Sequence, residues 1–150
     1  MKKPTPFLWF NNQAEEAAKF YCSVFKDSKI TAVRRKGKKV VTVEFRLNGQ
    51  EFIALNGGPR FKFTHAVSFV ISCKNQEEID YYWKKLSKGG EEVECGWLKD
   101  KYGLSWQVVP EALENLLWGP DSKQKDRVWK ALMKMTKLDI DGLKQAAKGK

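Results

Sequence analysis

One order of elements occurs twice along this chain, and this internal repeat constrains the fold more than any other feature. Residues 4–58 read as a short apolar strand, a helix and then three further strand-like segments. The same order returns over residues 64–110, and residues 111–150 show a helical pattern without strands. The sequence therefore predicts an α+β fold of two tandem βαβββ modules with a C-terminal helical tail, in a single 150-residue domain.

The elements of the first module follow from the spacing of its apolar residues. Residues 7–10 predict a strand, and Asn11 or Asn12 suits the N-cap of a helix. Apolar residues then recur at steps of three and four, which is typical of an amphipathic helix; they are Ala14, Ala17, Ala18, Tyr21, Val24 and Phe25. Three strands are expected at 29–34, 40–47 and 51–56, the last two joined by a hairpin turn at Asn48-Gly49.

The second module and the tail carry clear helix boundaries. Asn75, with Glu78 three residues later, predicts a capped helix that Gly89-Gly90 ends. Its strands are expected at 66–73, 92–95, 97–101 and 105–109. In the tail, we expect one helix beginning near Asp121 and a shorter one after Asp139. The first of these would place Val128, Ala131, Leu132 and Met135 on one apolar stripe.

The net charge of +10 raises the question of nucleic-acid binding, but its distribution argues against it. Half of the excess lies after residue 118 and half before it. The densest basic run, Arg34–Lys39, lies between two strand-like segments, where a solvated hairpin tip is expected. Because no RNA- or DNA-reading motif accompanies this run, nucleic-acid binding through it is only a third and weaker alternative.

The cysteines and the hydropathy bear on the cellular compartment expected for this chain. Cys22, Cys73 and Cys95 are odd in number and widely spaced, and no apolar run follows Met1. These features predict free thiols in a reducing cytoplasm. No apolar stretch approaches the roughly 18 residues that span a bilayer, so no membrane association is expected.

Four blocks of the chain resemble one known family. They are Pro6–Phe10 with Ala14–Ala17 and Phe20-Tyr21, Glu51–Pro59, Cys95–Pro110, and Met133–Met135 with Lys137–Ile140. Together they resemble the PhnB-like branch of the vicinal oxygen chelate (glyoxalase/bleomycin resistance) superfamily, whose members are often labelled demethylubiquinone methyltransferase domains. A methyltransferase that uses S-adenosylmethionine would be expected to have a parallel α/β sheet and a glycine-rich turn after its first strand, whereas Gly57-Gly58 and Gly89-Gly90 lie elsewhere.

The resemblance implies a curved mixed sheet around a pocket, in which related enzymes hold a divalent metal with four His or Glu side chains. The corresponding positions here are Thr5 or Pro6, Ala54, His65 or Ala66, and Gln107. Phe52 and Asn56 would share the face of Ala54. One imidazole and two neutral amides are a poor ligand set for a dication, so no metal and no other cofactor are expected.

The function implied by this resemblance is binding of an unidentified small molecule, with a homodimer as the expected assembly. The expected lining of the pocket is Phe52, Asn56, His65, Trp97 and Gln107. The alternative is a metal-independent enzyme, of lyase, isomerase or transferase type, that acts through His65 or Cys95. Adjacent helical residues do not face each other, so Glu15 and Glu16 are not a paired acid and base.

Overall fold

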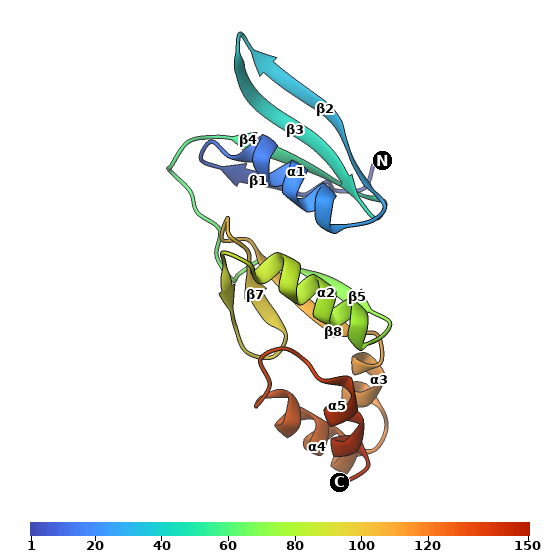
Figure 1. Ribbon diagram of the computed structural model, residues 1–150. Helices are drawn as coiled ribbons and strands as arrows, with labels where there is room; N and C mark the ends of the chain where they lie inside the picture. The colour runs from blue at the N-terminus through green and yellow to red at the C-terminus, as the bar shows by residue number, and fades with distance from the viewer. The chain divides into compact units, whose positions relative to one another are not determined.

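The repeat expected from the sequence is visible in the order of the elements, as the ribbon shows (Figure 1). The computed structural model describes all residues from Met1 to Lys150. Contacts divide the chain into two units, residues 1–63 and residues 64–150. Each unit contains one four-stranded mixed sheet, and the second also contains the helical tail. The α+β class and the tandem βαβββ order are therefore confirmed.

The first unit has one helix and one sheet, here called sheet A. Its elements are β1 (Phe7–Phe10), α1 (Ala14–Val24), β2 (Ser28–Lys36), β3 (Lys39–Leu47) and β4 (Gln50–Asn56). The strand order is β1-β4-β3-β2, in which β1 and β4 run parallel and the other neighbours antiparallel. Asn48 and Gly49 both have positive φ, at 46° and 82°, and form the predicted hairpin turn between β3 and β4.

Helix α1 covers one face of sheet A and thereby fixes which side chains are buried. Its stripe of Ala14, Ala17, Ala18, Tyr21 and Val24 is buried. Tyr21 stacks on Phe45 of β3, with ring centroids 6.1 Å apart, and Phe45 stacks on Phe52 of β4 at 5.3 Å. Successive strand residues alternate between faces, so Phe45, Phe52 and Ala54 all lie beneath the helix. This face is the core of the first unit.

The start of α1 differs from the sequence prediction. The N-cap position is Gln13, whose side chain makes no capping hydrogen bond, so Asn11 and Asn12 do not cap the helix. The side chain of Asn56, 42 residues away, does this instead: its Oδ1 accepts from the Ala14 N–H at 2.8 Å. Helix caps are usually local, and a cap donated by a distant strand is not detectable from local sequence.

The second unit repeats the arrangement with sheet B. Its elements are β5 (Ser68–Cys73), α2 (Gln76–Ser87), β6 (Glu91–Glu92), β7 (Trp97–Lys99), β8 (Ser105–Pro110), α3 (Leu113–Trp118), α4 (Ser122–Leu132) and α5 (Ile140–Ala147). The strand order is β5-β8-β7-β6, with β5 and β8 parallel. The predicted caps are confirmed, because Asn75, Asp121 and Asp139 each accept from backbone N–H groups of the helix that follows.

Two elements of the second unit were not anticipated. The strand expected at 92–95 is only two residues long, because Cys95 and Gly96 turn away from the sheet with positive φ. Their N–H groups instead bind the carbonyls of Met135 and Thr136, each at 2.8 Å. Helix α3, at 113–118, had no counterpart in the predicted elements. Hydrogen bonds to the tail therefore explain why the strand expected at 92–95 is short.

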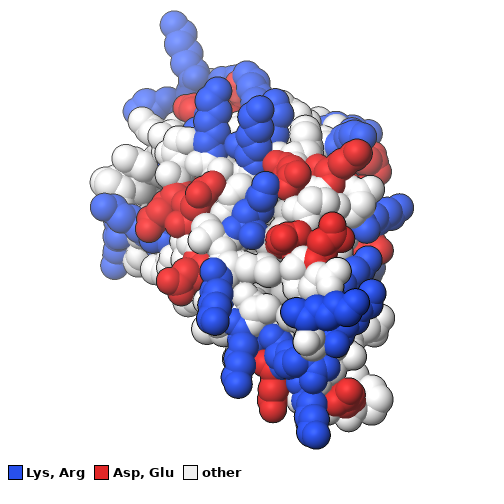
Figure 2. Space-filling model, turned by 60° about the horizontal axis from the view of Figure 1, so that its bottom comes forward, with Lys and Arg blue, Asp and Glu red and all other residues white.

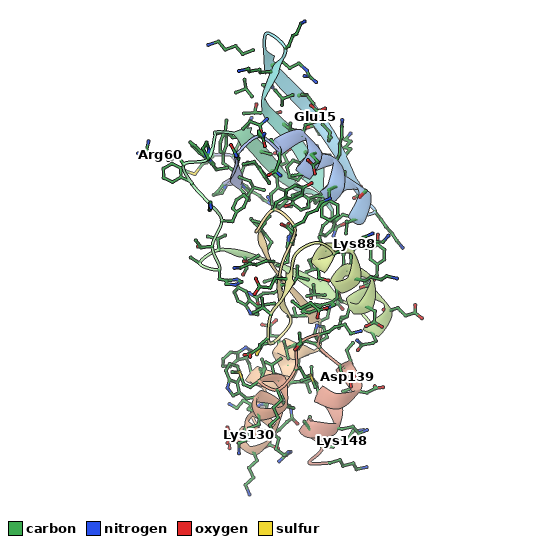
Figure 3. The ribbon with its side chains drawn as sticks, turned by 60° about the vertical axis from the view of Figure 1, so that its left-hand side comes forward. Glu15, Arg60, Lys88, Lys130, Asp139 and Lys148 are labelled. Atoms are coloured by element: carbon green, nitrogen blue, oxygen red, sulfur yellow. The ribbon has the colours of Figure 1, made fainter.

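The tail has a small apolar core of its own. Val128 and Leu132 of α4 are buried together with Leu138 and Leu143. Asp139, which precedes α5, and Lys148, which follows it, are labelled in Figure 3. Arg127 of α4 binds the end of α5, donating from Nε to the Ala146 carbonyl at 2.9 Å and from Nη2 to the Ala147 carbonyl at 2.6 Å. The stripe of α4 is thus covered within the chain and needs no second subunit.

The basic run Arg34–Lys39 forms the tip of the β2–β3 hairpin, as predicted. Two of its charges are paired, Arg34 with Glu44 at 3.1 Å and Arg35 with Glu15 of α1 at 3.3 Å. Figure 2 shows Lys and Arg side chains scattered across the visible face with acidic side chains between them. None of the five helices is long and apolar enough to cross a membrane.

A buried carboxylate organises the connection between β7 and β8. Asp100 is only 2% exposed. Its Oδ1 accepts from the N–H groups of Tyr102 and Leu104, and its Oδ2 accepts from the Trp106 indole at 2.9 Å. Both oxygens are therefore satisfied, and the same contacts hold the Trp106 ring in the core of sheet B.

We expect Asp100→Asn to lower the free energy of unfolding by about 1–3 kcal/mol, because a buried amide NH₂ would face either the Trp106 indole N–H or two backbone N–H groups. Urea unfolding followed by Trp fluorescence measures this. The control is Asp126→Asn at an exposed position of α4, which should change stability by about 0.5 kcal/mol or less. Equal stability of the two variants would contradict a structural role for Asp100.

Candidate functional site

One face of sheet B is covered by α2, and the other face carries the candidate site. Leu98, Trp106 and Val108 are buried residues of strands that contact α2. Alternation places the intervening residues, Trp97 and Gln107, on the opposite face. The register supports this, because Trp97 lies directly opposite Gln107 on the neighbouring strand. We call this opposite side the open face of sheet B.

His65 lies against the open face, in the turn before β5. Its Nδ1 is 2.9 Å from the Oγ of Ser105, a residue that is fully buried. Its ring meets Trp97 edge-on, with centroids 6.0 Å apart. The bond to Ser105 fixes the orientation of the imidazole and leaves Nε2 as the nitrogen free for another partner.

Gln107 is held in place by a second serine of the open face. Its Nε2 donates to the Oγ of Ser68 at 2.9 Å, which leaves Oε1 as an available acceptor. Ser68 is paired with Ser105 in the parallel ladder between β5 and β8. His65, Gln107 and the two serines therefore form one polar cluster beside Trp97. The serines were not among the expected site residues, although the alternation of Ser105 with Gln107 along β8 could have indicated Ser105.

Phe52 and Asn56, the other two expected lining residues, lie in sheet A on the face covered by α1. Phe52 belongs to the aromatic stack beneath the helix. Asn56 uses both parts of its amide for the fold, since Oδ1 binds Ala14 and Nδ2 donates to the Val40 carbonyl at 3.1 Å. Phe52 and Asn56 thus serve the core and the helix cap of the first unit, whereas His65, Trp97 and Gln107 lie together in the second unit.

Trp9 of the edge strand β1 lies on the opposite face of sheet A, and its position explains the glycines that follow β4. The Trp9 indole N–H donates to the Gly58 carbonyl at 2.9 Å, and its ring meets Phe61 edge-on. A Cβ at Gly57 would overlap with the indole ring. The Gly57-Gly58 pair therefore allows a close approach of backbone to Trp9, a packing role rather than binding of a phosphate.

The thiols have environments that disfavour nucleophilic chemistry. Burial and the neighbouring Glu94 carboxylate raise the pKa of Cys95. Its Sγ lies 3.7 Å from the Met133 sulfur, against the tail. Burial raises the pKa of Cys73 to about 12, with smaller contributions from Glu78 and Glu111. A thiol with a raised pKa is protonated near neutral pH, whereas the thiolate is the nucleophile.

The residues at the implied metal positions do not fit a divalent cation. Ala54 is apolar and fully buried under α1, and Gln107 offers one neutral amide oxygen. No group of three or more His, Cys, Asp or Glu side chains is arranged to hold a metal ion. The sheets also lack the parallel α/β arrangement expected for an S-adenosylmethionine site, since each has only one parallel pair.

Comparisons with known proteins agree with this architecture. Residues 2–109 match the family described as 3-demethylubiquinone-9 3-methyltransferase. A PhnB protein of Bacillus cereus that carries the same name is 37% identical, with 73% of this chain and 99% of that chain covered and a TM-score of 0.68. No functionally curated protein matches the chain in sequence.

More distant solved structures share the fold. Protein PA1353 of Pseudomonas aeruginosa is 16% identical, with 74% of this chain and 98% of that chain covered and a TM-score of 0.63. The fosfomycin resistance protein FosX of Listeria monocytogenes, solved with Mn(II) and sulfate, is 14% identical. The likeness covers 75% of this chain and 92% of that chain, with a TM-score of 0.55. With the family match and the Bacillus relative, these likenesses show that the chain belongs to the 3-demethylubiquinone-9 3-methyltransferase-like family, the PhnB-like branch of the vicinal oxygen chelate superfamily.

Proposed function

We propose that this protein binds an organic small molecule on the open face of sheet B, through His65, Trp97 and Gln107. The observation that carries the proposal is the polar cluster on a sheet face that α2 leaves uncovered. Binding sites for small molecules typically combine apolar surface with a few positioned polar groups. Trp97 provides the apolar surface here, and His65 and Gln107 provide the polar groups.

The serines give this site a fixed geometry before any ligand arrives. Ser105 holds the His65 ring and Ser68 holds the Gln107 amide, so Nε2 and Oε1 are presented without a further loss of side-chain entropy. Depending on its tautomer, His65 donates or accepts at Nε2, and Gln107 accepts at Oε1. A ligand with a hydroxyl or amide group beside an aromatic or aliphatic body suits this arrangement.

The second candidate, a metal-independent enzyme, is supported less well. Ser105 lies within hydrogen-bond distance of an imidazole, as a nucleophile would, but it is fully buried and out of reach of a substrate. The raised pKa of Cys95 argues against a thiolate. His65 remains available as a general base through Nε2, but no nucleophile or acid is placed beside it.

The binding proposal predicts that a small molecule accompanies the protein through purification. Mass spectrometry of compounds released by denaturation should find one species enriched with the wild type and reduced at least fivefold with the double variant His65→Ala/Gln107→Ala. The matched control Arg34→Ser/Lys38→Ser, at the hairpin tip, should retain it. The same compound at equal amounts in all three proteins, or no compound in the wild type, would count against the site.

We further propose that binding does not require a metal. Elemental analysis of protein purified without added metal should show well under one equivalent of zinc, nickel, iron or manganese, because one imidazole and one amide are too few ligands for a site in water. His65→Ala should leave the metal content unchanged. A stoichiometric metal that is lost in His65→Ala would overturn the proposal.

We also propose that two chains form a two-fold dimer. Strand β2 is nine residues long and lies at the edge of sheet A with its outer backbone groups unpaired, and such edges are usually covered. Light scattering at tens of micromolar should give twice the 17.3 kDa mass of the chain. A monomer mass for the full chain would contradict the proposal.

A further inference from the structure

A shallow groove of about 270 Å³ lies along the open face of sheet B and ends against α3. Val70, Ser72, Gln107 and Val109 form its floor, and Leu113, Leu117 and Trp118 form its wall. Val70 is 60% exposed and Trp118 is 74% exposed, which is unusual for large apolar side chains beside one hollow. Gln107 belongs both to the groove and to the cluster with His65.

The wall of the groove lies outside the region that matches the family model. The match ends at residue 109, so the floor lies within the matched region and the wall lies beyond it. Helix α3 thus forms a side wall to a sheet face whose floor lies within the matched region. A wall of this kind changes which molecules fit the face without altering the polar cluster.

The charges at the groove have the opposite sign to the protein as a whole. The chain carries a net charge of +10, but Glu111 and Glu114 line the groove. Both are exposed and neither is part of an ion pair. The Glu111 N–H donates to the Cys73 carbonyl at 2.9 Å, which fixes its backbone at the end of β8. Two free carboxylates beside an exposed indole favour a positive charge.

We propose that this groove selects organic cations with an aromatic or aliphatic body, as an extension of the binding face. The apolar body lies on Val70 and Val109, the cationic group lies between Trp118 and the two carboxylates, and a polar group of the ligand reaches Gln107. The proposal rests on the proposed function and adds the charge of the ligand to it.

Three probes that share one aromatic ring test the charge preference: benzyltrimethylammonium, benzyl alcohol and phenylacetate. Their binding to the full chain is followed by NMR, through the indole N–H signals of Trp118 and Trp97 and the side-chain amide of Gln107. We expect the cation to bind about fivefold more tightly than phenylacetate and to shift the Trp118 signal. The double variant Glu111→Gln/Glu114→Gln should reduce that preference below about twofold.

The control Glu77→Gln/Glu94→Gln changes the net charge equally, at exposed positions of the same unit, and should keep the preference. Equal or tighter binding of phenylacetate, or a Trp118 signal that never moves, would overturn the charge preference. If all three probes still shift Trp97 and Gln107 in that case, the binding face itself stands. If no probe shifts any of these signals, both the groove and the proposed function fail.

Discussion

The packing of one helix on one face of each sheet is the constraint on which the rest of this structure depends. In each unit, the helix buries every second residue of the strands that it contacts, and the remaining residues face the other way. Whether a side chain is buried under the helix therefore depends on its odd or even position along the strand more than on its chemical identity. Gln107 and Phe52 both lie in central regions of their sheets, but only Gln107 has the parity that leaves it available for a ligand.

The elements were predictable from sequence wherever a local signal determines them. Asn48-Gly49 forms its hairpin turn, and Asn75, Asp121 and Asp139 cap their helices, because each interaction joins residues that are close in the sequence. Distant contacts were not predictable. Asn56 caps α1 from 42 residues away, and the N–H groups of Cys95 and Gly96 bind tail carbonyls instead of a neighbouring strand. The site was predictable in part for the same reason, since alternation shows which residues share a face but not which face the helix covers.

The family name implies a chemistry that the residues of the candidate site do not indicate. The name describes a methyltransferase, whereas the open face of sheet B offers an imidazole, an amide and an indole held by two serines. These groups suit recognition by shape and hydrogen bonding. The tail has its own core and forms the α3 wall of the groove, and both lie outside the matched region.

We propose the open face of sheet B as the binding surface, and not the face under α2 or the hairpin tip of sheet A. A crystal structure of the protein with the molecule that accompanies it through purification tests this most directly. We expect a ligand in contact with Trp97, within hydrogen-bond distance of His65 Nε2 or Gln107 Oε1. A ligand bound at Arg34–Lys39, or one that touches none of these three side chains, would contradict it.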